Sequence, residues 1–264
     1  MSAIPTYDAE QLAGMLAILP DVDSVELKLT VPDDFQRSAV RLLGIDPLDA
    51  VLRQVVFVDT PDLRLSSAGV VLRARRTQHK PGDLAVKLRP AMPAEVPKGF
   101  RDHQGFKVEL DASPAGYTCS CSLTVEAPDR LVRKLMIGTR GVRGLLDDDQ
   151  RTLLDERLPD GVGPDDLVVL GPINLLKTRF RVKGYRRRMV AELWVLPDGS
   201  RILELSTKAP PEEAFQAAAE TKALLAGKGL DLGAPQETKT RSALAALTVP
   251  ESERTAGDAA HDEG

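Results

Sequence analysis

Residues 70–76 read VVLRARR, and this short segment shows the pattern that decides the fold. Side chains of a β-strand point alternately to its two faces, so Arg73 and Arg75 lie on one face and Leu72 and Ala74 on the other. The segment is therefore predicted to be a strand with one basic and one apolar face. A comparable alternation recurs in residues 25–31 (VELKLTV), 84–89 (LAVKLR), 106–111 (FKVELD), 175–183 (LLKTRFRVK), 190–196 (VAELWVL) and 202–208 (ILELSTK).

The charged faces of these strands have two explanations. In a single antiparallel strand, such a face would lie against water and carry no special meaning. Across six or seven strands, however, like charges on neighbouring strands destabilise a sheet unless acidic residues lie between them. A closed barrel with the charged faces turned inward would have an interior lined by Lys and Arg, which a bound polyanion such as a phosphate chain would stabilise. The number of charged strands favours such a barrel, and a sheet with solvated charged faces stays the alternative.

Helical patterns surround the expected strands. Apolar residues at helical spacing predict helices over residues 8–19 and 212–225. Residues 128–160 read as a helical insertion between two groups of strands. We expect one domain over residues 1–250, which includes this insertion, and a small, polar and disordered tail over residues 251–264.

The overall composition is that of an ordinary globular protein. Hydrophobic residues make up 42% of the 264 residues and charged residues 28%, which argues against a disordered chain. Lys and Arg number 35 against 39 Asp and Glu, so a net charge of −4 gives no general attraction to nucleic acid or to an anionic membrane. The two cysteines argue against a disulfide-stapled secreted scaffold. We expect a cytoplasmic protein whose partner is a small polyanionic phosphate compound, with no nucleic-acid or membrane partner, and the oligomeric state stays open.

Residues 57–75, FVDTPDLRLSSAGVVLRAR, extend the opening strand upstream and resemble a characteristic stretch of one known family. That family is the CYTH domain, the fold of the triphosphate tunnel metalloenzymes, which include class IV adenylyl cyclases, thiamine triphosphatases and inorganic triphosphatases. SVELK at residues 24–28 lies at the position of the family's N-terminal ExExK motif, and KTRSALAAL at residues 239–247 is similar to its late element. The resemblance spans residues 23–247. Together with the charged faces it implies an α+β fold in which eight antiparallel strands form a β-tunnel (barrel) with flanking helices. It also implies that a divalent metal, Mg²⁺ or Mn²⁺, assists hydrolysis of a phosphoanhydride in the tunnel.

Candidate site residues follow from the alternation together with this resemblance. Carboxylates on the inward faces are oxygen ligands of the kind that Mg²⁺ and Mn²⁺ prefer, and the resemblance implies that glutamates of the first and last strands hold the metal. Arg and Lys would hold the phosphate chain, with Arg making bidentate contacts. We predict metal ligands Glu26, Glu192 and Glu204, with Glu109 and Asp111 as further inward carboxylates; catalytic residues Glu26, Lys28 and Glu109; and phosphate-binding residues Lys28, Arg73, Arg75, Lys87, Arg89, Lys107, Arg179 and Arg181.

Two departures from the family pattern separate two functional hypotheses. Ser24 stands where the family has the first Glu of ExExK, and Ser206 stands where the last strand usually has a second Glu. Each serine removes a carboxylate from the metal side of the site, while the phosphate side stays intact. The first hypothesis is a metal-dependent hydrolase acting on a triphosphate compound or on inorganic polyphosphate, and the alternative is a non-catalytic binding module with a degenerate metal site. A class IV adenylyl cyclase is a weaker third reading, because no residue pattern marks an adenine pocket.

Overall fold

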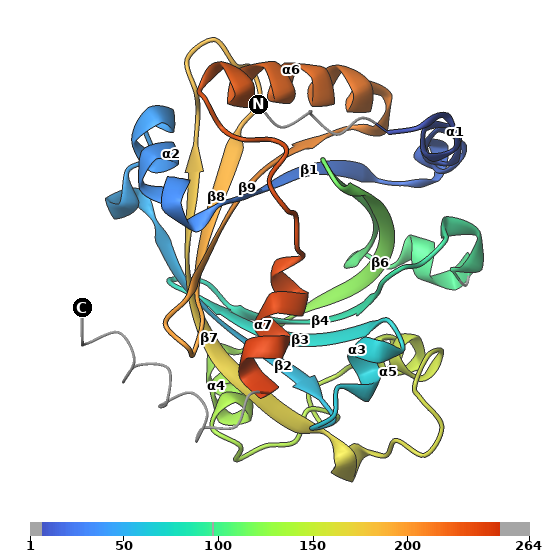
Figure 1. The fold of residues 1–264 in the computed structure, drawn as a ribbon. Helices are drawn as coiled ribbons and strands as arrows, with labels where there is room; N and C mark the ends of the chain where they lie inside the picture. Colours follow the sequence, from blue (N-terminus) through green and yellow to red (C-terminus); the bar gives the residue numbers. More distant parts are fainter. Residues whose placement is uncertain (1–6, 97, 249–264) are drawn as a thin grey trace.

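Nine strands close into one barrel in the computed structural model, which describes residues 7–96 and 98–248 (Figure 1). Around the barrel the order is β1-β5-β6-β4-β3-β2-β7-β8-β9, and β9 pairs with β1 to complete the ring. The predicted α+β barrel is thereby confirmed. The strands are β1 (Ser24–Val31), β2 (Val51–Asp59), β3 (Val70–Thr77), β4 (Gly82–Leu88), β5 (Phe106–Ser113), β6 (Gly116–Ala127), β7 (Val168–Phe180), β8 (Met189–Val195) and β9 (Arg201–Ala209).

The strand count and one pairing differ from the expected eight antiparallel strands. β6 has the sequence GYTCSCSLTVEA, whose small hydroxyl and thiol side chains give no alternation of charge, so the charge pattern contains no signal for it. β1 pairs with β9 in the antiparallel sense, and this direction leaves it parallel to β5 on its other edge. As a result, Ser24 and Glu26 lie directly beside Glu109 and Asp111.

Seven α-helices in the described residues flank or enter this ring (Figure 1). Helices form where residues 8–19 and 212–225 predict them, and two more lie within the insertion expected at residues 128–160. The expected tail at residues 251–264 lies outside the described residues, and a single domain stays a prediction. None of the helices that the structure describes is long and apolar enough to cross a membrane. The helices are α1 (Ala9–Ile18), α2 (Gln36–Leu43), α3 (Arg64–Ser67), α4 (Asp129–Met136), α5 (Asp148–Asp155), α6 (Ala214–Gly227) and α7 (Lys239–Thr248).

The apolar faces of the strands point outward and are covered by helices. Leu72 and Val86 are buried in one core with Leu153 of α5, and Leu205 is buried in a second core with Leu43 of α2. Because side chains alternate along each strand, the charged faces are left to point into the ring. The barrel therefore has the inward charged lining that the sequence pattern predicts.

In the view of Figure 1, α7 lies across the opening of the ring, and its apolar side chains pack against residues of three strands. Its Ala243 and Leu244 are buried with Phe57, Leu175 and Trp194, which belong to β2, β7 and β8. The rings of Phe57 and Trp194 stack with their centroids 6.5 Å apart. The barrel interior therefore has an apolar part beside α7 in addition to its charged lining.

A buried carboxylate from residues 57–75 holds the turn after β2. Asp59 is 2% exposed, and its Oδ1 accepts hydrogen bonds from the backbone N–H groups of Thr60 and Leu65, both at 2.8 Å. Its Oδ2 accepts a third from the N–H of Ser66 at 2.9 Å. The bonds from Leu65 and Ser66 satisfy N–H groups in the first turn of α3 that have no partner within the helix, and the bond from Thr60 holds the turn before it. The first Asp of the DTPD sequence thus has a structural role, because it fixes the path of the chain from β2 towards β3.

We expect Asp59→Ala to destabilise the fold by about 1–3 kcal/mol, because three backbone N–H groups lose their acceptor in a buried turn. Asp62→Ala is the matched control, since Asp62 is exposed in the same turn; it should change the free energy of unfolding by less than about 0.5 kcal/mol. Urea unfolding followed by circular dichroism measures both variants. Equal unfolding free energies for wild type and Asp59→Ala would contradict the structural role of this carboxylate.

Candidate functional site

The charged side chains inside the barrel pair around three buried acidic residues. Some of the pairing residues lie on consecutive strands, as Arg75 and Asp83 do, whereas Lys28 and Asp111 come from strands far apart in the sequence that the barrel places side by side. The three groups are the Asp111 cluster (with Lys28, Lys87 and Arg89), the Asp83 cluster (with Arg73 and Arg75) and the Glu192 cluster (with Glu204, Lys177 and Lys239).

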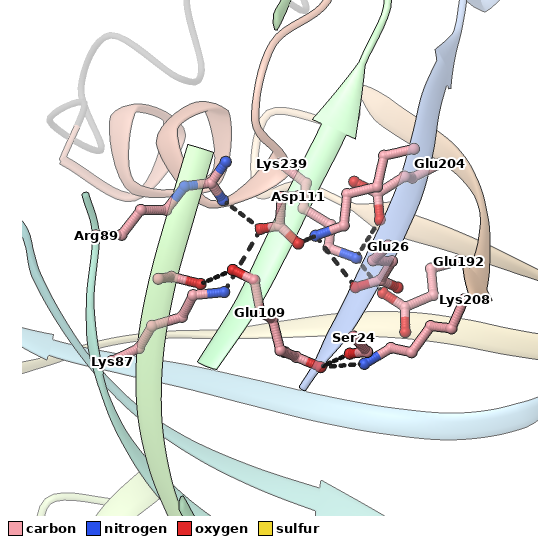
Figure 2. Close-up of polar contacts among 12 residues, drawn as sticks. Ser24, Glu26, Lys87, Arg89, Glu109, Asp111, Glu192, Glu204, Lys208 and Lys239 are labelled. Atoms are coloured by element: carbon pink, nitrogen blue, oxygen red, sulfur yellow. Dashed lines mark hydrogen bonds and ion pairs between the residues drawn. The ribbon is translucent and has the colours of Figure 1, made fainter. Parts of the chain in front are cut away.

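In the first cluster, Asp111 of β5 contacts three cations of the predicted phosphate site (Figure 2). Its Oδ1 lies 2.9 Å from Lys28 Nζ, and its Oδ2 lies 3.0 Å from Arg89 Nη1 and 3.6 Å from Lys87 Nζ. Lys28 Nζ also lies 3.4 Å from Glu26 Oε2 on the same strand. The Asp111 side chain is 3% exposed, whereas those of Lys87 and Arg89 are about a quarter exposed. The cations are therefore accessible from solvent, and the carboxylate lies behind them.

These contacts shift the pKa of three groups in the Asp111 cluster. Burial alone would raise the pKa of Asp111, but Lys87, Lys28 and Arg89 hold it well below its ordinary value. Burial lowers the pKa of Lys28, yet Asp111 and Glu26 outweigh this effect and raise it above the ordinary value. For Lys87, burial prevails over the attraction of Asp111, so its pKa lies below that of an ordinary lysine. Asp111 is thus ionised at neutral pH and acts as an internal counter-ion for cations that are predicted to bind phosphate.

The Asp83 cluster has more positive than negative charge. Arg75 Nε donates to Asp83 Oδ2 at 2.8 Å, and Arg73 Nη2 lies 3.8 Å from Asp83 Oδ1. On the neighbouring strand β2, burial and the charge of Arg75 lower the pKa of Arg53 to about 10. Burial and Arg75 also lower the pKa of Arg73. An anion bound beside these guanidinium groups would relieve their mutual repulsion.

The Glu192 cluster links three strands to the first residue of α7. Glu192 and Glu204 lie directly opposite each other on β8 and β9. Lys239 Nζ donates to Glu204 Oε1 at 2.6 Å and also to Glu192 Oε2, while Glu192 Oε1 accepts a hydrogen bond from Lys177 Nζ at 2.8 Å. Lys239 Nζ lies 5.6 Å from the centre of the Trp194 ring. Two carboxylates predicted to bind a metal therefore have lysine ammonium groups as partners.

Glu109, a predicted catalytic residue, is also paired with a lysine (Figure 2). Its Oε1 accepts hydrogen bonds from Lys208 Nζ and, at 3.3 Å, from Ser24 Oγ. Burial would raise the pKa of Glu109, but Lys208 outweighs it and lowers the pKa below its ordinary value. Ser206, the second departure from the family pattern, is buried on β9 opposite Lys28. Both serines thus lie beside residues of the candidate site.

Three predicted phosphate ligands lie apart from the clusters. Lys107 is the second residue of β5, Arg179 is the last but one of β7, and Arg181 follows β7; all three are exposed. None of them makes an ion pair with the residues that the structure describes. Alternation along a strand predicts which face a side chain occupies, but it does not predict how deep in the barrel that side chain lies.

Four further cations inside the barrel have no role in the sequence prediction. Lys177 and Lys208 lie on the charged faces of β7 and β9, so the alternation along these strands could have identified them. Arg53 precedes the apolar half of β2, where charge alternation is absent. Lys239 reaches its partners only because α7 packs inside the ring, and no local pattern predicts such a contact. The four residues are Arg53, Lys177, Lys208 and Lys239.

The carboxylates, as they are arranged, do not fit a divalent cation. Hard divalent cations such as Mg²⁺ require several oxygen ligands that converge on one point. Within residues 7–96 and 98–248, no group of three or more Asp, Glu, His or Cys side chains is placed to hold a metal ion. Lys239 pairs with both Glu192 and Glu204, and Glu26 faces Lys28. The expectation of Mg²⁺ or Mn²⁺ therefore continues to rest on the family resemblance.

Comparisons with known proteins find similarity at the level of the fold. No protein-family model matches the chain, and no curated protein matches it. A "putative adenylate cyclase" from Bacillus halodurans has a TM-score of 0.58 at 14% identity, over 83% of this chain and 96% of that protein. A "putative adenylyl cyclase" from Hippeastrum, described as having a dominant triphosphatase activity, has a TM-score of 0.59 at 17% identity, over 85% of this chain and 97% of that protein. The chain therefore shares the barrel fold of these proteins, in agreement with the CYTH-like fold that its sequence resembles.

Proposed function

We propose that the barrel interior binds the phosphate chain of a small compound with several linked phosphates, such as a triphosphate or inorganic polyphosphate. An excess of positive charge carries this proposal: in the Asp111 and Asp83 clusters, five Lys and Arg side chains share Asp111, Asp83 and, through Lys28, the neighbouring Glu26. These five side chains are 19–30% exposed, so a ligand can reach them. Phosphate oxygens would replace the carboxylates as acceptors, with Arg73 and Arg75 able to make bidentate contacts.

A chain of phosphates suits this arrangement better than a single phosphate. Lys87 and Asp83 are four residues apart on β4, and they point to the same face of the strand. Four residues correspond to about 13 Å along a strand, so the two clusters are neighbouring but separate charge centres. A linked chain contacts both centres at once, whereas one phosphate contacts only one. The described activity of the Hippeastrum protein, a triphosphatase with the same fold, supports a ligand of this class.

Hydrolysis of a phosphoanhydride is the second candidate function. The same Hippeastrum activity favours it, and Glu26, Lys28 and Glu109 are the residues predicted to take part. Ser24, Ser206 and the pairing of Lys239 with two predicted metal ligands favour a binding module instead.

Phosphate release distinguishes the two candidates. The substrates are tripolyphosphate, thiamine triphosphate, nucleoside triphosphates and long polyphosphate, each with Mg²⁺, Mn²⁺ or EDTA. For a binding module we expect no release above that of the Glu26→Gln variant under any condition. Release by the wild type that Glu26→Gln abolishes would establish the hydrolase instead.

Neighbouring arginines on β3 test the proposed ligand site. Arg75 points inward to Asp83, whereas Arg76 points to the outer face and pairs with Asp129 of α4. We expect Arg75→Gln to weaken tripolyphosphate binding by about 1.5–3 kcal/mol, because a charge-assisted hydrogen bond is lost. Arg76→Gln should bind like the wild type. Isothermal titration calorimetry measures these affinities and that of orthophosphate, which should bind far more weakly; equal losses in the two variants would place the anion outside the barrel.

The lowered pKa of Lys87 predicts a pH dependence of binding. The ammonium form binds phosphate, and its proton is lost at a lower pH than that of an ordinary lysine, whose pKa is about 10.4. Tripolyphosphate affinity should therefore fall as the pH rises through the lowered pKa of Lys87, in a range where ordinary lysines are still charged. Lys87→Arg should shift this fall to higher pH, because a guanidinium in the same place keeps its proton to a higher pH than an ammonium does. Calorimetric titrations from neutral to alkaline pH measure both proteins, and an identical decline in the variant would refute the role of Lys87.

A further inference from the structure

We propose that the Lys239 ammonium is a built-in counter-ion for Glu192 and Glu204, so that polyphosphate binds in the barrel without a divalent metal. The inference rests on the proposed function. It assigns to a side chain of α7 the positive charge that the family resemblance assigns to Mg²⁺ or Mn²⁺.

Lys239 has the contacts of a shared counter-ion. Glu192 and Glu204 are register partners on β8 and β9, so their carboxylates would repel each other inside the barrel without a cation between them. Lys239 Nζ donates a hydrogen bond to each of them. The side chains of Glu192 and Glu204 are 11% and 6% exposed, so water screens the pair poorly. The ammonium therefore neutralises charge where a bound cation would otherwise be required.

The helix that carries Lys239 fixes the ammonium in place. Lys239 is the first residue of α7, whose Ala243 and Leu244 are buried within the barrel. The ammonium also lies over the ring of Trp194, at 5.6 Å from its centre, and cations bind favourably to this face of an indole. The buried part of α7 thus holds the backbone of Lys239 close to Glu192 and Glu204.

The charge state of the cluster agrees with this arrangement. Burial lowers the pKa of Lys239, but Glu204 and Glu192 outweigh it and raise the pKa above that of an ordinary lysine. Burial would raise the pKa of Glu192, but Lys239 and Lys177 hold it well below its ordinary value.

The two serines complete the argument. A carboxylate at position 24 or 206 would add negative charge beside Glu26 or Lys28, whereas a hydroxyl adds none. Fewer carboxylates weaken the binding of a divalent ion, because affinity rises with the number of charged oxygen ligands. Lys208, from a half-exposed position, likewise pairs with Glu109 (Figure 2). Carboxylates predicted to serve the metal site are thus paired with lysines.

Two measurements test this inference. The first is the affinity of the wild type for tripolyphosphate in EDTA and in Mn²⁺; we expect binding in EDTA that Mn²⁺ does not strengthen. The second is the affinity for Mn²⁺ without tripolyphosphate, which electron paramagnetic resonance measures through the signal of the free ion. It is measured for the wild type, Lys239→Met and Lys239→Arg. Lys239→Met should bind Mn²⁺ at least about tenfold more tightly than the wild type, because two carboxylates lose their counter-ion, and Lys239→Arg should not. Lys222→Met, at an exposed position of α6, is the control and should match the wild type.

Each outcome decides the matter. Tripolyphosphate binding that requires Mn²⁺, or no gain of Mn²⁺ affinity in Lys239→Met, would overturn the role of Lys239. Absence of tripolyphosphate binding in both EDTA and Mn²⁺ would overturn the proposed function itself. The Mn²⁺ affinities of the wild type and Lys239→Met would then still test whether Lys239 is the counter-ion of Glu192 and Glu204. If Lys239→Met does not fold, the wild-type comparison in EDTA still supports or overturns the inference.

Discussion

Like charges confined inside a closed barrel are the constraint on which the rest of this structure depends. Cations in a ring of strands repel one another strongly at low dielectric, and each needs a carboxylate close by when no ligand is bound. Asp111, Asp83 and Glu192 meet this need, each from a different strand. Removing one partner of such a pair leaves an unpaired buried charge, so the acidic residues are as necessary to the fold as the cations are to binding.

The outer architecture follows from the same constraint. With the charged faces turned inward, the apolar faces of the strands must be covered from outside, which α2 and α5 achieve through Leu43 and Leu153. α7 is different, because it packs against inward residues and delivers a lysine to the charged lining. The helix therefore connects the apolar and charged halves of the interior. In this way a packing interaction determines the charge balance of the candidate site.

Part of this arrangement could be predicted from alternation alone. The common face of Arg73 and Arg75 follows from the two-residue period of a strand, whereas the closed barrel is expected from the charged faces together with the resemblance of residues 57–75. β6 could not be predicted in this way, because Glu126 near its end is its only charged residue and no charge alternates along it. The omission of β6 explains the expected count of eight. Alternation also does not predict how deep in the barrel a side chain lies. Arg179 is therefore on the predicted face of β7, but it is exposed near the end of that strand. The contact of Lys239 with Glu204 joins residues 35 positions apart through tertiary packing, which no local pattern encodes.

The central claim is that polyphosphate displaces internal carboxylates from the basic lining of the barrel. A crystal structure of the chain with tripolyphosphate, grown in EDTA, tests it most directly. The account predicts phosphate oxygens within hydrogen-bond distance of Arg73, Arg75 and Lys87, with Lys239 still paired to Glu192 and Glu204. Tripolyphosphate bound only on the outer surface, with the Asp111 and Asp83 clusters unchanged, would contradict it.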